Sequence, residues 1–436
     1  MEKGVSNVSG IVKFVIYSIL GVVAFFVPVT IGGVNRIPID HITNALYGVF
    51  EPFYVYIVLA LCAYAFVDMY LTKSYKRSAV DTVLSVTKVL GAVIVLLIIF
   101  KIDVPYLMAP GIAPATLVNM GKSAIMITCV AFFLPFLLDY GLIDAVGVIA
   151  KPFMRPVFKV PGITAVVAAS TFLGNFSIGL LSTSKLYKTG RLTKKEAAVV
   201  ATGFSTISIG LMLLFTQLLK ISDKFLFYFC STAIVTYIVT AITVRIPPLS
   251  AIPEEYCEGV VPDAEEDVKE KKLKQAFAVG VEVAHKAPSP LSTISAIIFA
   301  TLRVLANMIS SSMFIIVAGL LINAHTPLFQ WLGMVFYPVL KVFNMPNIDV
   351  LLRSTGLAAI DVIPAVMYGS SQELLPAARY VLAAFPVSLI IFIGGYFTCL
   401  ISTDVPVKIR DLVFLWFERM FISLIFYCAI ALVFFG

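Results

Sequence analysis

Long apolar runs, separated by short polar or charged segments, extend from the beginning of the chain to its end. Val89 to Phe100 reads VLGAVIVLLIIF, and Phe421 to Phe435 is almost as apolar. A transmembrane β-strand alternates apolar and polar residues, whereas a membrane-spanning helix needs about 20 predominantly apolar residues in succession. The pattern therefore predicts an all-α polytopic membrane protein with about 9–11 membrane segments. The expected segments are residues 11–31, 50–71, 80–100, 121–140, 163–185, 196–219, 225–246, 293–323, 348–368, 374–401 and 412–435.

The composition agrees with this pattern and excludes several classes of protein. Of the 436 residues 60% are hydrophobic, and the 13% that are charged amount to about half the share in a soluble globular protein. A soluble multidomain enzyme and a disordered chain are excluded. The net charge of +7 comes from lysines beside apolar segments. This is the positive-inside pattern, so it indicates orientation in a lipid bilayer rather than binding to nucleic acid.

The basic clusters predict which loops face the cytoplasm. The segments 73–77, 151–159 and 185–195 are rich in lysine and arginine, so each is expected inside, with the N-terminus cytoplasmic. Segment 163–185 lies between two inside clusters and is rich in glycine and small polar residues. We therefore expect it to enter and leave by the same face, as a re-entrant hairpin or broken helix. Segment 348–368 is expected to form a second hairpin from the outside.

The chain also contains an internal repeat. RPVFKVPG, from Arg155 to Gly162, aligns with YPVLKVFN, from Tyr337 to Asn344, at an offset of 182 residues. Three full crossings in each repeat would place the second copy upside down, and inverted-topology repeats with broken elements are typical of secondary transporters. The predicted organisation is N-terminal helices at 1–118, a first repeat at 119–247, a charged cytoplasmic linker at 248–290 and a second repeat at 291–436. A surface helix is expected from about residue 263 to residue 285, with Val268, Phe277, Val279 and Val283 on its apolar face.

The first repeat resembles a known family in its motifs. From Pro161 to Gly210 the chain has a glycine-rich turn, the run Y-x-x-G-x-x-T-x-x-E-A-A (Tyr187 to Ala198) and then FSTIS. These features resemble the nucleoside-recognition (Gate) domain of bacterial membrane proteins. The later passages AIDVIPAVMYGS, AARYVLAAF and VPVKIRDLVFLWFERM are similar to YjiH-type members. The resemblance covers about residues 120–430 and makes both repeats Gate repeats.

The resemblance implies a protein of the bacterial cytoplasmic (inner or plasma) membrane. Gate domains also occur in concentrative nucleoside transporters, which are coupled to sodium or protons and have two hairpins near the membrane midplane. This chain departs from the family pattern after FPVSLIIF, where an acidic residue is expected and Gly394 to Thr398 reads GGYFT. The residues therefore leave open whether Na⁺ or H⁺ is a coupling ion, and no cofactor is expected.

Asp361 is the first candidate for a functional charge. It stands among apolar residues in the second predicted hairpin, and a charge at the bilayer centre costs on the order of 3 kcal/mol or more. Such a carboxylate either belongs to a structural ion pair or binds a substrate or ion. Arg303, within a long apolar segment, is either its counter-ion or a contact for an anionic substrate group. Arg353 and Arg379 are alternatives.

Small polar residues form the second group of candidates. Their hydroxyl and amide groups are suited to a hydroxylated ligand, although serine and threonine also join membrane helices in ordinary packing. Glu196 follows Thr193 by three residues, which is the spacing of a capping box, so we expect it at a helix start. The candidates for substrate binding are Asn175, Ser177, Ser182 and Thr183 in the first hairpin, and Ser205 and Ser208 on the next helix.

Enzymatic readings find little support in the sequence. There is no G-x-S-x-G motif, and the three histidines lack the spacing of a metal site. We therefore expect a secondary transporter for a small polar solute, nucleoside-like by analogy with the family, that works by alternating access. The alternatives are a non-transporting membrane component for assembly or signalling and a lipid or polyprenyl carrier. A homo-oligomer is compatible with each.

Overall fold

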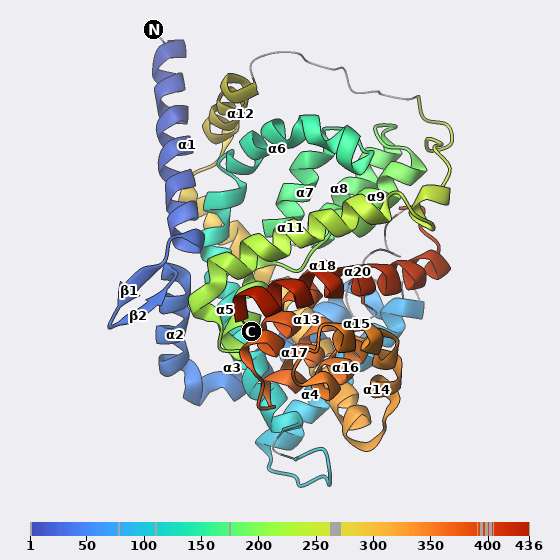
Figure 1. Cartoon of the computed structure of the whole chain (residues 1–436). Helices are drawn as coiled ribbons and strands as arrows, with labels where there is room; N and C mark the ends of the chain where they lie inside the picture. Colours follow the sequence, from blue (N-terminus) through green and yellow to red (C-terminus); the bar gives the residue numbers. More distant parts are fainter. Residues whose placement is uncertain are drawn as a thin grey trace.

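The computed structural model describes residues 2–76, 79–109, 111–173, 176–261, 272–389, 391–392, 396, 400, 403 and 405–435. These residues form α-helices and one small antiparallel hairpin of β1 (Val29–Ile31) and β2 (Val34–Arg36) (Figure 1). The predicted all-α polytopic class is confirmed. Six helical segments of the described chain are long and apolar enough to cross a membrane: Pro38–Thr72, Ala113–Leu137, Lys194–Leu218, Ser222–Thr243, Thr301–His325 and Ile409–Phe435.

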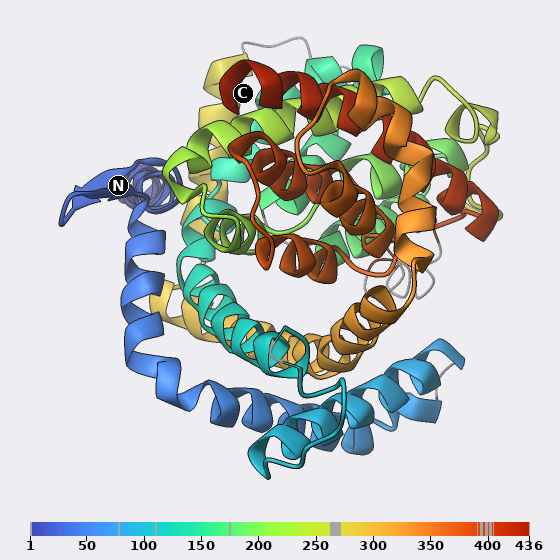
Figure 2. The same cartoon turned by 60° about the horizontal axis from the view of Figure 1, so that its bottom comes forward.

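The N-terminal helices and one later helix form a layer along one side of the molecule. Helix α13 (Pro290–His325) packs along α3, α4 and α5, and Figure 2 shows the blue N-terminal helices as an arc around the green-to-red part of the chain. Gly91 allows close approach in this layer, because a Cβ there would lie 2.0 Å from the carbonyl oxygen of Ser310. The remaining helices of the layer are α1 (Glu2–Phe26), α2 (Pro38–Phe50), α3 (Tyr54–Thr72), α4 (Ala79–Ile99) and α5 (Ala113–Leu138).

The first predicted repeat consists of short helices followed by a longer one. The expected hairpin at 163–185 is two contacting helices, α7 and α8, and α7 at 10 residues is only about 15 Å long, too short to cross the bilayer alone. Residues 174 and 175, which join them, lie outside the described part, so the re-entrant course stays a prediction. The elements are α6 (Leu142–Phe153), a π-helical turn (Met154–Phe158), α7 (Thr164–Leu173), α8 (Phe176–Lys188), α9 (Lys194–Phe204), α10 (Ile209–Leu218) and α11 (Phe225–Thr243).

The second predicted repeat follows the same order. A short helix leads into two more short helices that pack together, then into a helix that ends early at Ser388, and finally into a long helix. The division into two repeats and the inversion of the second copy stay predictions. The elements are α14 (Leu328–Gly333), α15 (Tyr337–Val342), α16 (Ile348–Leu357), α17 (Val362–Ser370), α18 (Pro376–Ser388) and α20 (Ile409–Phe435), and 3₁₀ turns occur at Glu51–Phe53, Ser74–Lys76, Ser222–Lys224, Leu249–Ala251 and Met334–Phe336.

The charged linker contains the helix α12 (Lys272–Lys286), close to where a surface helix is expected. It packs on α1 and α6, and the predicted face is partly confirmed. Phe277 is 46% exposed but stacks edge-on against the ring of Phe14 at a centroid distance of 5.5 Å, and Val279 and Val283 are half-buried. The residues that are fully buried beside Phe14 are Ala276, Val281 and Ala284. The smaller side chains are inside because α1 comes very close, and a Cβ on Gly280 would meet the ring of Phe14 at 2.5 Å. Val268 lies outside the described residues.

Candidate functional site: the interrupted helices

The apolar segment from Lys194 to Leu218 is interrupted in its middle. Helix α9 ends at Phe204 and α10 begins at Ile209, and between them Ser205 and Ser208 have extended backbone conformations. The sequence accounts for the interruption, because serine and threonine bond to nearby backbone groups and favour caps over helix interiors. The hydroxyl of Ser208 accepts from the N–H of Leu211 at 3.4 Å and so caps α10.

A capping box fixes the other end of α9. The hydroxyl of Thr193 accepts from the N–H of Glu196 at 3.2 Å, and the Glu196 carboxylate accepts from the N–H of Thr193 at 2.9 Å. The predicted helix-start role of Glu196 is therefore confirmed. Arg155 lies 3.3 Å from the same carboxylate, which ties the π-helical turn to the start of α9.

The interruption leaves the last carbonyl groups of α9 without helical partners, and side chains from other elements bond them. The hydroxyl of Thr171 in α7 donates to Phe204 O at 2.9 Å, and Tyr396 donates to Ala201 O at 3.0 Å. Gly203 O accepts from Thr240 of α11 at 2.6 Å. These side chains provide the hydrogen bonds that an unbroken helix would make internally.

A second interruption follows α18, which ends at Ser388; among the described residues after it, 389, 391 and 392 are not helical. The carbonyl of Ser388 accepts from Nε of Arg419 at 2.9 Å. The hydroxyl of Ser388 is hydrogen-bonded to Tyr427 and, at 2.9 Å, to Thr236 of α11. Arg419 also reaches the first interruption, since its Nη2 lies 3.5 Å from Gly203 O.

The two interruptions thus meet in the interior of the molecule. Helix α18 packs against both α11 and α20, and α11 and α20 run side by side (Figure 1). At the start of α8, the ring of Phe176 contacts the rings of Phe392 and Tyr396, at centroid distances of 6.1 and 5.9 Å. The first pair of short helices therefore contacts the chain that follows α18. The arrangement brings helix ends, carbonyl groups and hydroxyl groups into one polar cluster within an apolar core.

The structure places some of the predicted binding residues at this cluster and others elsewhere. Ser205 and Ser208 flank the first interruption. Thr183 is buried and donates to Gly179 O in its own helix, while Ser182 faces a separate cavity of about 610 Å³ beside Lys185. Asn175 lies outside the described residues, as does the side chain of Ser177.

Asp361 has a different environment from the one predicted. It is the N-cap of α17, where its Oδ1 accepts from the N–H of Ile363 at 3.0 Å, and it is 7% exposed. Arg303 is half exposed and pairs with Asp68 of α3 at 2.8 Å. The prediction that Arg303 is the counter-ion of Asp361 is therefore wrong.

The two alternative arginines do not pair with Asp361 either. Arg353 donates to the carbonyl of Asn323 and to the side chain of Gln330, both at 3.2 Å, and Arg379 donates to Leu374 O at 2.9 Å. Sequence reasoning missed Arg419, although the rule that singled out Asp361, a charge within an apolar segment, applies to it equally.

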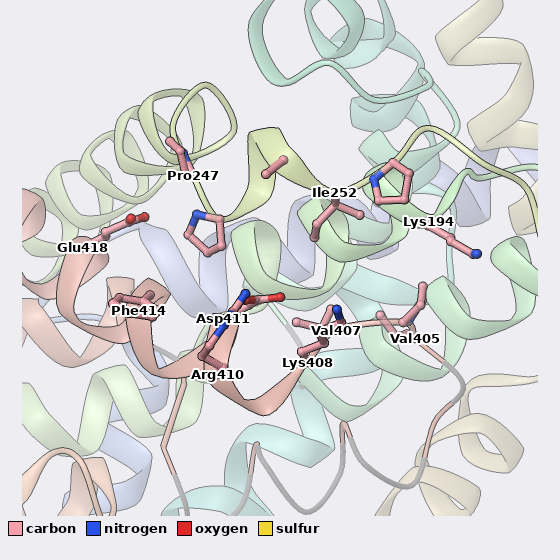
Figure 3. Close-up of a pocket in the computed structure, with 14 residues that line it drawn as sticks. Lys194, Pro247, Ile252, Val405, Val407, Lys408, Arg410, Asp411, Phe414 and Glu418 are labelled. Atoms are coloured by element: carbon pink, nitrogen blue, oxygen red, sulfur yellow. The ribbon is translucent and has the colours of Figure 1, made fainter.

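The structure also has a surface pocket of about 830 Å³ (Figure 3). It lies between the loop at 247–253 and the segment 405–411. Glu418 lies at one end of the pocket and Lys194 at the other, with Arg410 and Asp411 between them. Oε2 of Glu418 is buried and has no hydrogen-bond partner among the described residues. The pocket mixes charges of both signs beside the helix that carries Arg419.

Comparison with known families identifies the segment around the first interruption. Residues 122–222 match the family model Gate, which is described as nucleoside recognition. This part of the chain is therefore similar to Gate domains. The matched region contains α7 and α8 and the whole interrupted helix α9–α10. The resemblance to Gate domains that the motifs predicted is therefore confirmed for residues 122–222. The narrower resemblance to YjiH-type proteins stays a prediction.

Two relatives with similar sequences align with different lengths of this chain. An uncharacterized protein of Alkalihalophilus pseudofirmus is 26% identical over 438 residues, covering 97% of this chain and 94% of its own. The sporulation integral membrane protein YlbJ of Bacillus subtilis is 30% identical over 91 residues, 20% of this chain and 22% of its own. The match to the Gate model and the six apolar helical segments of the described chain establish a multi-pass membrane protein and support a membrane transporter.

Solved structures of CNTnw cover nearly the whole chain. The structure in an inward-facing substrate-bound state is 13% identical and covers 99% of this chain and 93% of its own, with a TM-score of 0.44. A single-substitution variant of CNTnw in the intermediate 3 state is 12% identical and covers 99% and 92%, with a TM-score of 0.42.

Proposed function

We propose that this protein is a secondary transporter that moves a small polar solute, nucleoside-like in chemistry, across the bacterial cytoplasmic membrane by alternating access. The observation that carries the proposal is the meeting of two interrupted helices inside a protein with a Gate domain. In secondary transporters, interrupted helices supply the polar groups that bind a solute at membrane depth. Coupling to an ion gradient and the oligomeric state stay predictions.

The residues proposed to contact the solute are the hydroxyl groups at the first interruption. Ser205 is buried, and Ser208 is partly exposed at the start of α10. The N-terminus of α10 adds the positive end of a helix dipole, which favours electronegative groups of a solute. Helix α10 also packs against α17, whose N-cap is Asp361.

Counterflow of labelled nucleosides and other small polar solutes in proteoliposomes tests the proposal. Ser205→Ala is expected to raise KM for the exchanged solute roughly 3- to 10-fold, because one neutral hydrogen bond contributes about 0.5–1.5 kcal/mol. Ser295→Ala is the matched control, since Ser295 is an exposed serine of α13 whose hydroxyl donates to Ser292 O in its own helix. Exchange no greater than in empty liposomes, across the whole set of solutes, would reject the proposal.

The inverted arrangement of the two repeats can be tested by labelling. Single cysteines at Lys188 and Ser371, both exposed, are expected to react from opposite sides of the membrane, the first from the cytoplasm. Gly369 is unsuitable for this purpose, because a Cβ there would lie 1.9 Å from a methyl carbon of Leu382. Labelling of both positions from the same side would remove the inverted repeat and alternating access with it.

A lipid or polyprenyl carrier is the second candidate, and one feature favours it. An almost wholly apolar cavity of about 520 Å³ lies among α2, α3, α5 and α13, with Leu46, Phe133 and Leu302 in its lining. Its apolar lining suits a hydrocarbon chain. Exchange of a fluorescent polyprenyl phosphate without exchange of any nucleoside would favour this candidate. Exchange of neither would favour the assembly component, for which the sporulation protein YlbJ is a precedent by name.

A further inference from the structure

Arg419 is a completely buried charge in the middle of a membrane-spanning helix. Its side chain is 0% exposed. It lies ten residues after the start of α20, which places it about 15 Å along a helix long enough to cross the bilayer. A charge at that depth is costly and needs a compensating group. Among the described residues, no carboxylate lies within 4 Å of its guanidinium group.

The groups that compensate Arg419 are the ends of the two interrupted helices. Its Nε donates to the carbonyl of Ser388, the last residue of α18, at 2.9 Å. Its Nη2 lies 3.5 Å from the carbonyl of Gly203, in the last turn of α9. Its Nη1 donates to the hydroxyl of Thr240 at 3.3 Å. Both carbonyls belong to the negative end of a helix dipole, so the two dipoles converge on one cation.

Carbonyl groups at the C-terminal ends of interrupted helices are also the groups that hold a coupling sodium ion in many secondary transporters. Here a guanidinium group bonds them already. Its planar guanidinium group reaches acceptors on α18 and α11 and lies beside the end of α9. The single ammonium group of a lysine could not reach all of these acceptors in the same geometry. We propose that Arg419 is a built-in cation that joins the two interruptions in place of a bound sodium ion. Transport by this protein then runs without sodium.

The inference rests on the proposed function, but its first test does not need a transported solute. The thermal stability of the purified protein is measured in detergent, in sodium chloride and in choline chloride at equal ionic strength. The wild type is expected to unfold at the same temperature in both salts. Arg419→Ala is expected to unfold at a lower temperature, which millimolar methylguanidinium or sodium raises again, because the two sets of carbonyl groups accept a free cation.

Arg245→Ala is the matched control. Arg245 also donates to main-chain carbonyl groups, those of Pro156 and Val157, but it is exposed. Removing it is not expected to make stability depend on either cation. If Arg419→Ala does not fold, Arg419→Lys is used, and it is expected to become more stable in sodium than in choline because one ammonium group leaves some acceptors unbonded.

Sodium-dependent stability of the wild type would overturn the inference, and so would variants at Arg419 that respond to neither cation. When an exchanged solute is in hand, its counterflow is measured in the same two salts. Equal rates are expected for the wild type, whereas a tenfold fall in choline would overturn the inference and leave the transporter proposal standing. Failure to find a solute would count against the transporter alone, because the stability measurements stand by themselves.

Discussion

Gly179 allows a close approach between the two short helices of the first repeat. A Cβ at this position would lie 1.8 Å from Cγ2 of Thr171, so alanine requires α7 and α8 to separate or Thr171 to turn away. Thr171 cannot turn freely, because its hydroxyl donates to Phe204 O at the interruption of α9. We predict that Gly179→Ala disturbs both the packing of the two helices and the hydrogen bond that holds the end of α9.

The magnitude follows from three contributions. Overpacking costs about 1–3 kcal/mol, loss of the hydrogen bond from Thr171 costs about 1 kcal/mol, and alanine's higher helix propensity returns about 1 kcal/mol. The expected net loss in the free energy of unfolding is therefore about 1–3 kcal/mol, measured by SDS titration in mixed micelles. Gly48→Ala is the control, since no atom lies within 4 Å of a Cβ at Gly48.

A double-mutant cycle makes this prediction sharper. Thr171→Ser removes the Cγ2 methyl group that the new Cβ would strike and keeps the hydroxyl group. The pair Gly179→Ala with Thr171→Ser should therefore be more stable than the sum of the single variants, by about 1 kcal/mol or more. If Gly179→Ala is as stable as Gly48→Ala, or if the serine restores nothing, the close contact between α7 and α8 is not as described.

Two further predictions concern charged residues. In the same SDS titration, Asp361→Ala should lower the free energy of unfolding by about 1 kcal/mol through loss of the helix cap, whereas Asp361→Asn should not. The effect of Arg303→Gln should simply add to the effect of either variant. A coupling energy above about 0.5 kcal/mol would contradict the separation of Asp361 from Arg303. The hydrogen bond from Lys195 lowers the pKa of Glu254 below the usual 4.5, so this contact should hold the loop at 251–256 fully above pH 4.5 and lose it as the pH falls through the lowered pKa. Hydrogen exchange of the loop would show this as protection that is lost as the pH is lowered in the wild type. In Glu254→Gln the protection should not change with pH.

The sequence alone predicted the helices well and their interruptions poorly. Length and hydropathy identified the segment 196–219 as one crossing, and the structure divides it at Ser205 to Ser208. Four non-helical residues change neither the length nor the average hydropathy of a 25-residue segment, so a window average misses them. The first expected segment, 11–31, was too long for a related reason. Helix α1 ends at Phe26, and the apolar residues from Val29 enter a β-hairpin.

The partners of polar side chains were beyond the reach of sequence patterns for a different reason. A local pattern predicted the capping box of Thr193 and Glu196, since both residues lie in one helical turn. Arg303 and Asp68 are 235 residues apart, and only the packing of α13 on α3 brings them together. Arg303 could therefore be recognised from the sequence as a residue that needs a partner, but the partner could not be named.

Asp361 and Arg419 show why a search for opposite charges was the wrong approach to this core. A buried charge in a membrane needs compensation, but an ion pair is only one form of it, and a helix end is another. Asp361 lies at the N-terminus of α17, where it accepts a backbone N–H, and Arg419 lies at the C-terminal ends of α9 and α18, where it meets carbonyl groups. Each charge thus has the helix end of opposite polarity as its partner. Such ends occur in the middle of a membrane protein only where helices are interrupted, so the interruptions are what allow both charges to be buried without an ion pair between them.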